Sequence, residues 1–512
     1  MSKGRVENST YNMISGFLYQ LIALIMSFLS RTVFIRILGL EYLGLNGIFA
    51  DVLNLLSMAD LGFNTTMAYS FYKPLAENDE KRLTALICFY KKVYHMIATI
   101  VTIMGLAVIP FLKLIINTEK EIPHLTLYYL FSLAGVVISY LFVYRTTILT
   151  ADQKNYEVLK VSICTTIAKT LLQIAALLIW KNYILYLSIG IIIQLLNNLI
   201  ISNKAENMYP YIKHKERISS EDEKSIFLNM KSIFLYKISG TMISATDNII
   251  ISFIVGTAMV GKYSNYIMIS NKLLLIIQIV FSALTASIGN VIVKEGTEKK
   301  YEIFRALQSL SYIFCGITTC VFGVIAYDLI TVWLGTEFTI PSMAVLALTF
   351  NTYLGCVLLP LWTYRDATGL YMKTKYIMLF GAMLNIVLSI ILGNIWGLTG
   401  VLFASVISRL STYFWYEPKI LFKDYFEKKA KEYFLSLFHN IMLVIVTMIM
   451  LSLIFRNVEV DGWFMLIVKG GCVGLVSTVV FFGAYARTDG FQMIIQKVEA
   501  IVMNVKNMNK KI

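Results

Sequence analysis

Long apolar stretches separated by short polar connections run through almost the whole chain. A transmembrane helix needs about 20 mainly apolar residues, and we identify fourteen such stretches. Because backbone that faces lipid must satisfy its own hydrogen bonds, stretches of this length cross as helices. The pattern therefore predicts an all-α polytopic membrane protein with spans near 11–38, 43–72, 93–117, 122–149, 157–180, 182–203, 225–255, 258–293, 301–334, 340–364, 371–395, 397–422, 433–455 and 462–486.

Two charged segments, 204–224 and 423–431, divide these spans into groups of six, six and two. Both segments are rich in lysine and glutamate, which is typical of loops in water. We expect an N-terminal six-helix lobe and a C-terminal six-helix lobe around a central cavity, followed by two additional helices. The predicted parts are the N-terminal lobe (1–208), a cytoplasmic linker (209–224), the C-terminal lobe (225–422), and two additional helices with a cytoplasmic tail (423–512).

A glycine-bounded segment occurs twice, at 38–45 and again 217 residues later at 255–262. Each copy joins the first two spans of a six-span group and reads apolar-Gly-x-x-apolar-apolar-Gly. An even number of spans per group gives both copies the same orientation. The repeat predicts two pseudo-symmetric lobes related by an axis along the membrane normal, as in parallel-repeat transporters.

The composition supports a lipid environment and excludes a soluble enzyme. The chain of 512 residues is 57% hydrophobic and 15% charged, whereas soluble domains carry about 25% charged residues. No zinc spacing, phosphate-binding loop, nucleophile elbow or paired carboxylates stand on a plausible aqueous loop. We therefore expect a transporter with no catalytic residues, no metal ligands and no cofactor, and we interpret the six cysteines as small buried hydrophobes.

The distribution of the 45 Lys and Arg against 31 Asp and Glu predicts the orientation. With the N-terminus inside, 33 of these cations fall on cytoplasmic segments, six on outer connections and six inside helices. Positive charge marks cytoplasmic loops, so both termini are predicted to be cytoplasmic. The long first span lacks a cleavage site, which disfavours a removable signal peptide. Topology accounts for the +14 net charge and leaves no reason to expect nucleic acid as a partner.

Ionisable residues at membrane depth are costly and usually face a wet cavity. Five of the six cations inside helices share a helical stripe with other polar residues, which predicts that they line a cavity; Lys469, near a helix end, is expected to pair or to reach the headgroups. A cavity with more cations than carboxylates suits an anionic substrate. The predicted substrate-binding residues are Arg31, Lys169, Lys237, Lys272 and Arg409.

Helical spacing places these polar residues on one face of each of five predicted spans. The predicted stripes are Gln20, Ser27 and Arg31; Ser162, Thr165, Thr166, Lys169 and Gln173; Lys237, Thr241, Ser244 and Asn248; Asn265 and Lys272; and Ser405, Arg409, Thr412 and Tyr416.

Three carboxylates, Asp60, Asp247 and Asp51, are candidates for a coupling proton or sodium ion or for charge partners of these cations. Asp51 and Asp60 are nine residues apart, which places them on opposite faces of a continuous helix. One of the two is therefore expected to be a structural partner.

The stretches SRTVFIRILGLEYLGLNG (30–47), LSMADLGF (56–63) and YSFYKPLAEND (69–79) resemble bacterial polysaccharide repeat-unit flippases. These are the capsule and O-antigen (Wzx-like) flippases of the multidrug/oligosaccharidyl-lipid/polysaccharide (MOP) exporter superfamily, and beyond residue 79 the resemblance continues as hydrophobic pattern. It implies a MATE-like fold in the bacterial cytoplasmic membrane and translocation of undecaprenyl-diphosphate-linked oligosaccharide by alternating access. It also implies a substrate-binding role for Arg31, and membrane lipids and a polysaccharide polymerase as partners.

Three other functions compete with this interpretation. A lipid II flippase is the closest alternative, but such flippases tend to have more arginines in the first lobe, where Arg31 is the only one at the midplane. A multidrug or organic-cation antiporter would have an acidic cavity. A polysaccharide polymerase would need a large arginine-rich outer loop, and every outer connection in this chain is short.

Overall fold

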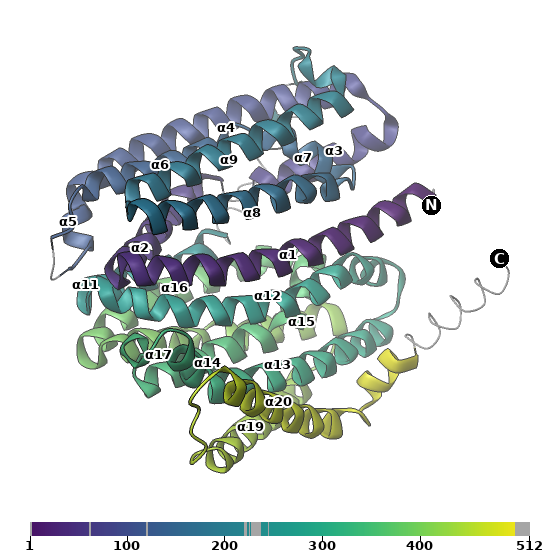
Figure 1. The fold of residues 1–512 in the computed structure, drawn as a ribbon. Coiled ribbons are helices and arrows are strands. Elements are labelled where there is room, and N and C mark those ends of the chain that lie inside the picture. Colours follow the sequence, from purple (N-terminus) through teal and green to yellow (C-terminus); the bar gives the residue numbers. More distant parts are fainter. Residues whose placement is uncertain are drawn as a thin grey trace, which may run out of the picture. The chain divides into compact units, whose positions relative to one another are not determined.

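The computed structural model describes residues 3–60, 63–118, 121–219, 223–224, 226, 237–243 and 245–496. Within these residues the regular secondary structure is entirely helical, which confirms the predicted all-α class (Figure 1). The chain forms two compact units, Met1–Gly261 and Lys262–Ile512. The six-helix lobes 1–208 and 225–422 stay a sequence-based prediction.

The first unit is built from long helices with short turns between them. Helix α1 runs along α8, α8 packs on α9, and α9 packs on α6 (Figure 1). Its elements are α1 (Lys3–Leu38), α2 (Leu40–Leu56), η1 (Ser57–Asp60), α3 (Phe63–Glu77), α4 (Glu80–Val108), η2 (Ile109–Phe111), α5 (Leu112–Ile115), α6 (Leu125–Tyr140), α7 (Val143–Ala151), α8 (Asn155–Trp180), α9 (Tyr183–Met208), η3 (Pro210–Lys213) and α11 (Asp247–Ile254).

The second unit begins inside α12 and centres on α13, which packs against α14, α19 and α20. Helices α16 and α17 form a second closely packed pair. The elements are α12 (Thr257–Lys294), α13 (Thr297–Trp333), η4 (Thr336–Phe338), α14 (Ser342–Val357), α15 (Leu359–Thr368), α16 (Tyr371–Trp396), α17 (Leu398–Ser411), α18 (Tyr413–Leu421), η5 (Phe422–Phe426), α19 (Lys431–Ile454) and α20 (Trp463–Tyr485).

Nine helices in the described part of the chain are long and apolar enough to cross a membrane. Two more spans result if the bent pairs α6–α7 and α14–α15, with bends of 48° and 42°, each count as one. Large apolar side chains on these helices are exposed, for example Phe17, Ile103 and Phe464. Exposed apolar surface of this extent is typical of contact with lipid, and the chain is a multi-pass membrane protein.

Several predicted spans are divided, contrary to the expectation of one helix each. Span 43–72 consists of α2, η1 and α3, and span 397–422 breaks at Thr412, whose backbone leaves the helical region. In span 340–364 the break precedes Pro360, which lies in the first turn of α15 where proline is tolerated. Span 225–255 lies partly outside the described residues, because 225, 227–236 and 244 are not described.

The division of the second span corrects the argument about its two aspartates. Helix α2 ends at Leu56 and Asp60 ends the 3₁₀ turn η1, so the nine-residue spacing does not run along one α-helix. The prediction that Asp51 and Asp60 lie on opposite helix faces assumed one continuous α-helix, and this assumption was wrong.

The two glycine segments pack against each other within the first unit. A side-chain methyl at Gly44 would overlap the carbonyl oxygen of Thr257, and one at Gly261 would overlap that of Leu40. Thr257 and Leu40 are themselves 217 positions apart, as are the two glycines. The contact is thus reciprocal, and each copy of the repeat supplies one glycine and one backbone carbonyl to it.

Two further hydrogen bonds fix the second glycine segment. The hydroxyl of Ser252 donates to the carbonyl oxygen of Ile115 over 2.8 Å. The backbone amide of Thr257 donates to the backbone carbonyl oxygen of Asn117 over 2.8 Å. The backbone turns at Gly256, between Ser252 and Thr257. The φ of Gly256 is 120°, a value that residues with a side chain rarely adopt.

Candidate functional site

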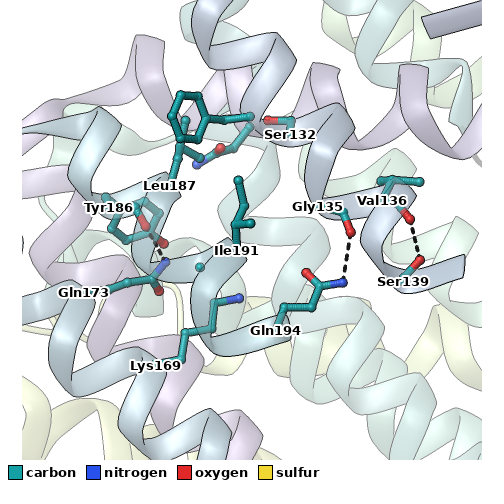
Figure 2. Close-up of a pocket in the computed structure, with 13 residues that line it drawn as sticks. Ser132, Gly135, Val136, Ser139, Lys169, Gln173, Tyr186, Leu187, Ile191 and Gln194 are labelled. Carbon is teal, nitrogen blue, oxygen red and sulfur yellow. Dashed lines mark hydrogen bonds between the residues drawn. The ribbon is translucent and has the colours of Figure 1, made fainter. Parts of the chain in front are cut away.

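A polar cavity of about 400 Å³ lies in the first unit, between α2, α6, α8 and α9 (Figure 2). Most of its polar lining comes from amide, hydroxyl and lysine side chains. The lining residues are Asn46, Phe131, Ser132, Gly135, Val136, Ser139, Lys169, Gln173, Tyr186, Leu187, Gly190, Ile191 and Gln194.

Lys169 provides the charge of this cavity. It lies on α8, is half-buried, and makes no ion pair or hydrogen bond with any residue that the structure describes. Its side chain extends among Tyr186, Ile191 and Gln194 (Figure 2). A lysine without a carboxylate partner at this depth is costly unless water or an anion meets it.

Two glutamines hold the helices around Lys169 in place. The amide nitrogen of Gln173 donates to the backbone oxygen of Tyr186 at 2.9 Å, which ties α8 to α9. The amide nitrogen of Gln194 donates to the backbone oxygen of Gly135 at 3.0 Å, which ties α9 to α6. These bonds leave the amide oxygens of both glutamines available to a ligand or to water.

The predicted polar stripe on the fifth span lies on one continuous helix. Helix α8 is continuous over 26 residues, so the helical spacing holds. Thr165 donates to the side-chain oxygen of Asn197 on α9 at 2.9 Å, while Lys169 and Gln173 line the cavity. The stripe therefore faces α9.

Glycines create the volume of the cavity. A methyl at Gly190 would lie 3.2 Å from the amide nitrogen of Gln173 and 3.7 Å from Cε of Lys169. A methyl at Gly135 would lie 3.7 Å from the amide oxygen of Gln194. Any larger residue at Gly190 would occupy the space in front of the lysine.

Arg31 reaches the same region through Tyr186. Its guanidinium on α1 interacts electrostatically with Tyr186, whose hydroxyl bonds to Ser30. The ring of Phe34 lies edge-on to Tyr186 with centroids 5.1 Å apart. The structure thus places Arg31 near Tyr186, which lines the same cavity as Lys169.

Aromatic residues pack beside Asn46 at the edge of the cavity. The hydroxyl of Tyr183 donates to the side-chain oxygen of Asn46 at 2.5 Å. The rings of Tyr128 and Tyr42 lie 4.7 and 5.1 Å from that of Tyr183. Tyr128 and Tyr183 are buried and Tyr42 is half-buried, so the first role of this cluster is to hold Asn46 in position.

The charge of the cavity favours an anion. None of the described residues that line it is a carboxylate, and Lys169 lines it with Arg31 nearby. Arginine and lysine form short charge-assisted hydrogen bonds with phosphate oxygens. The arrangement can bind a phosphate-bearing group, and it contains no nucleophile paired with a base.

In the second unit, Arg409 lines a separate cavity of about 180 Å³. Lys272 on α12 is half-buried and follows Asn271, which lines this cavity. The predicted stripe around Arg409 is only partly correct, because Ser405 is buried and accepts from Asn385 on α16 at 3.0 Å. Tyr416 lies beyond the break at Thr412, on α18.

The remaining predicted residues lie elsewhere in the first unit. Lys237 and Asp247 are half-buried, and both interact with other residues. Asp51 is buried; its carboxylate accepts hydrogen bonds from the side chain and backbone of Asn248, and its second oxygen has no partner among described residues. The side chain of Asp60 lies outside the described part.

The structure shows which charges pair with each other, which the sequence analysis did not predict. Lys469 forms an ion pair with Asp328 on α13, with 2.7 Å between nitrogen and oxygen. Of the two roles expected for Lys469, pairing or reaching the headgroups, the structure shows pairing. Arg365 on α15 binds Glu417 on α18 at 3.3 Å, and both side chains are buried. Arg365 directly follows the predicted span 340–364, where charge is ordinarily solvated, and the structure buries it instead.

We expect Arg365→Met to lower the free energy of unfolding by about 3–5 kcal/mol, because Glu417 would remain fully buried without its cation. The double variant Arg365→Met/Glu417→Leu should regain most of this loss, since no buried charge is left. Thermal unfolding of the purified variants in one detergent measures both effects. Equal losses in the single and double variants would contradict the ion-pair explanation.

The described residues contain no group of three or more His, Cys, Asp or Glu side chains that could hold a metal ion. All six cysteines are free. Cys315, Cys320 and Cys356 are buried, as expected of small hydrophobes, whereas Cys164 and Cys472 are exposed on apolar helices.

No protein-family model matches the chain, and no curated protein matches its sequence. Solved structures do match. The chain is similar to the lipid II flippase MurJ in an inward closed conformation, with 14% identity and a TM-score of 0.63 over 93% of this chain and 99% of that chain. It is also similar to an inward-facing multidrug resistance MATE family transporter of the MOP superfamily, with 14% identity and a TM-score of 0.58 over 77% and 93%.

A eukaryotic MATE transporter matches with 11% identity and a TM-score of 0.57 over 79% of this chain and 94% of that chain. These identities are low, so the similarities concern the fold. They show that the chain has the fold shared by MurJ and MATE transporters, as the sequence analysis expected.

Proposed function

We propose that the protein is a flippase that moves undecaprenyl-diphosphate-linked oligosaccharide repeat units across the bacterial cytoplasmic membrane by alternating access. The observation that carries the proposal is the cavity of the first unit, where Lys169 stands without a carboxylate partner among described residues. The fold shared with MurJ and MATE transporters and the resemblance of residues 30–79 to polysaccharide flippases support it.

In this mechanism the diphosphate is the group that the first unit binds. Lys169 meets one phosphate, and Arg31, which interacts with Tyr186 of the cavity lining, meets the second. Because the guanidinium is planar and always charged, it can hold two phosphate oxygens at once. Binding requires no bond to be made or broken, so the protein acts as a transporter rather than an enzyme.

The other predicted residues have secondary roles in this proposal. Lys237, Lys272 and Arg409 would add positive potential for the anionic substrate. Asp51, Asp60 and Asp247 are candidates for a coupling proton or sodium ion, and the unpartnered oxygen of buried Asp51 supports its inclusion. Membrane lipids and a polysaccharide polymerase are the proposed partners, and both termini are proposed to lie in the cytoplasm.

Translocation of lipid II is the second candidate, because the structural similarity to the lipid II flippase MurJ extends over 99% of that chain. Lipid II carries the same polyprenyl diphosphate, so the first-unit cavity suits it equally. A cation or drug antiporter is less compatible with a cavity whose described lining has no carboxylate. Translocation assays with each lipid separate the two flippase functions.

We expect Gly190→Leu to reduce transport by at least about tenfold without changing any charge, because the new side chain fills the space between Lys169 and Gln173. Export of polymer by cells that depend on the variant measures the effect. Gly16→Leu is the matched control, since a side chain at Gly16 meets nothing within 4 Å. Equal transport by the two variants would mean that the cavity is not the substrate site.

A further inference from the structure

The cavity of the second unit differs in character from that of the first. It lies between α12, α14, α15 and α17 and has a volume of about 180 Å³. Asn271 and Gln278 are exposed at its edge, whereas Asn351, Trp362 and Arg409 are half-buried. Its described lining therefore combines amides, one cation and an indole ring.

Three polar atoms of this lining are buried and have no hydrogen-bond partner among described residues: the side-chain oxygen of Asn351, Nε of Arg409 and Nε1 of Trp362. The amide nitrogen of Asn351 donates to the backbone oxygens of Ala347 and Leu402 at 3.2 and 3.0 Å, which fixes the orientation of the amide. An unsatisfied buried polar group is costly. The lining thus holds one acceptor and two donors for a ligand that both donates and accepts hydrogen bonds.

Trp362 contributes an indole ring to the lining and lies beside the side chain of Arg365. The guanidinium carbon of Arg365 lies 5.7 Å from the centroid of the Trp362 ring. Arg365 is itself bound by Glu417, so the buried ion pair positions the indole. A rigid ring of this kind presents a flat apolar face beside polar groups.

The composition of the cavity narrows the ligand class. An aliphatic ligand would leave Asn351 and Arg409 unsatisfied, and a hard metal ion needs carboxylate oxygens, which the described lining lacks. A diphosphate is better served by several cations than by Arg409 alone. The volume corresponds to roughly six water molecules, which is the scale of a single sugar ring with its hydroxyl groups.

We propose that this cavity binds one sugar ring of the translocated glycan, with its apolar face on Trp362 and its hydroxyl groups on Asn351 and Arg409. This inference rests on the proposed function. It assigns sugar recognition to the second unit and recognition of the diphosphate to the first. Trp362 is then a residue that determines specificity for the glycan without contributing to binding of the lipid diphosphate.

The test compares two probes on the full-length protein in nanodiscs. One probe is undecaprenyl diphosphate, and the other is the undecaprenyl-diphosphate-linked oligosaccharide extracted from the producing cells. Trp362→Ala should weaken binding of the glycosylated probe by about tenfold or more and leave binding of undecaprenyl diphosphate within about twofold of wild type. Trp362→Phe should retain most of the affinity, and Trp396→Ala is the control because Trp396 is exposed on α16.

The outcomes separate this inference from the proposed function. If wild type binds both probes and Trp362→Ala weakens neither, or weakens both equally, the sugar site is wrong and the flippase proposal stands. If wild type binds neither probe, both proposals fail. A selective loss for the glycosylated probe supports the sugar site.

Discussion

The double variant Arg31→Gln/Lys169→Gln should abolish export of the polysaccharide in cells that depend on this protein. Each side chain can form a charge-assisted contact with one phosphate, and two such contacts are worth about 3–6 kcal/mol together. That free energy corresponds to roughly 10²- to 10⁴-fold in affinity. Polymer at the cell surface, measured against the amount of protein in the membrane, reports the loss.

The variant should still fold and insert, because both side chains are only half-buried and glutamine keeps a polar group at each position. Arg36→Gln/Lys181→Gln is the matched control: it removes the same two charges from exposed positions of the same unit. We expect the control to export polymer at the wild-type level. If both double variants export equally, the anion site is not at Arg31 and Lys169.

The second large effect is expected at the reciprocal glycine contact. Gly44→Ala should lower the free energy of unfolding by about 1–3 kcal/mol or more, because the added methyl would overlap the backbone oxygen of Thr257. Backbone cannot move aside as a flexible side chain can. Gly261→Ala should cost a similar amount, since its methyl would overlap the backbone oxygen of Leu40.

Gly47→Ala provides the control on the same helix. Its methyl would lie 3.4 Å from a methyl of Val260, at the edge of ordinary contact, and alanine is the better helix former. Thermal unfolding in detergent should therefore separate Gly44→Ala and Gly261→Ala from Gly47→Ala. The two harmful substitutions should also combine to less than the sum of their effects, because they disturb one contact. Indistinguishable stabilities at Gly44 and Gly47 would refute this explanation.

Hydropathy predicted the helical class correctly because lipid imposes the same requirement on every span. It did not predict the internal breaks. Pro360 was an available signal for the break before α15. The 3₁₀ turn at Ser57–Asp60 contains no proline or glycine, and the nearest signal in the sequence is Gly62, two residues after the turn.

The accuracy of the site prediction followed the continuity of the helices. Lys169 lies on an unbroken helix of 26 residues, and its predicted polar face lines a cavity. Arg409 also lines a cavity, but its stripe was extended across the break at Thr412 to Tyr416. Helical spacing is informative only as far as the helix continues.

Pairs of charges distant in sequence could not be found from periodicity. Arg365 and Glu417 are 52 positions apart, and Asp328 and Lys469 are 141 apart. Arg365 and Glu417 each lie near the end of a predicted span, where charge is ordinarily solvated. Only the packing of α15 with α18 and of α13 with α20 brings these side chains together.

The most direct test of the central proposal is translocation in proteoliposomes that contain only this protein. A labelled undecaprenyl-diphosphate-linked oligosaccharide is placed in one leaflet, and its arrival in the other is followed with an impermeant reagent. We predict that wild type accelerates the movement and that Arg31→Gln/Lys169→Gln does not, while Arg36→Gln/Lys181→Gln does. Movement at the same rate with wild type, with the Arg31/Lys169 variant and with empty liposomes would contradict the account.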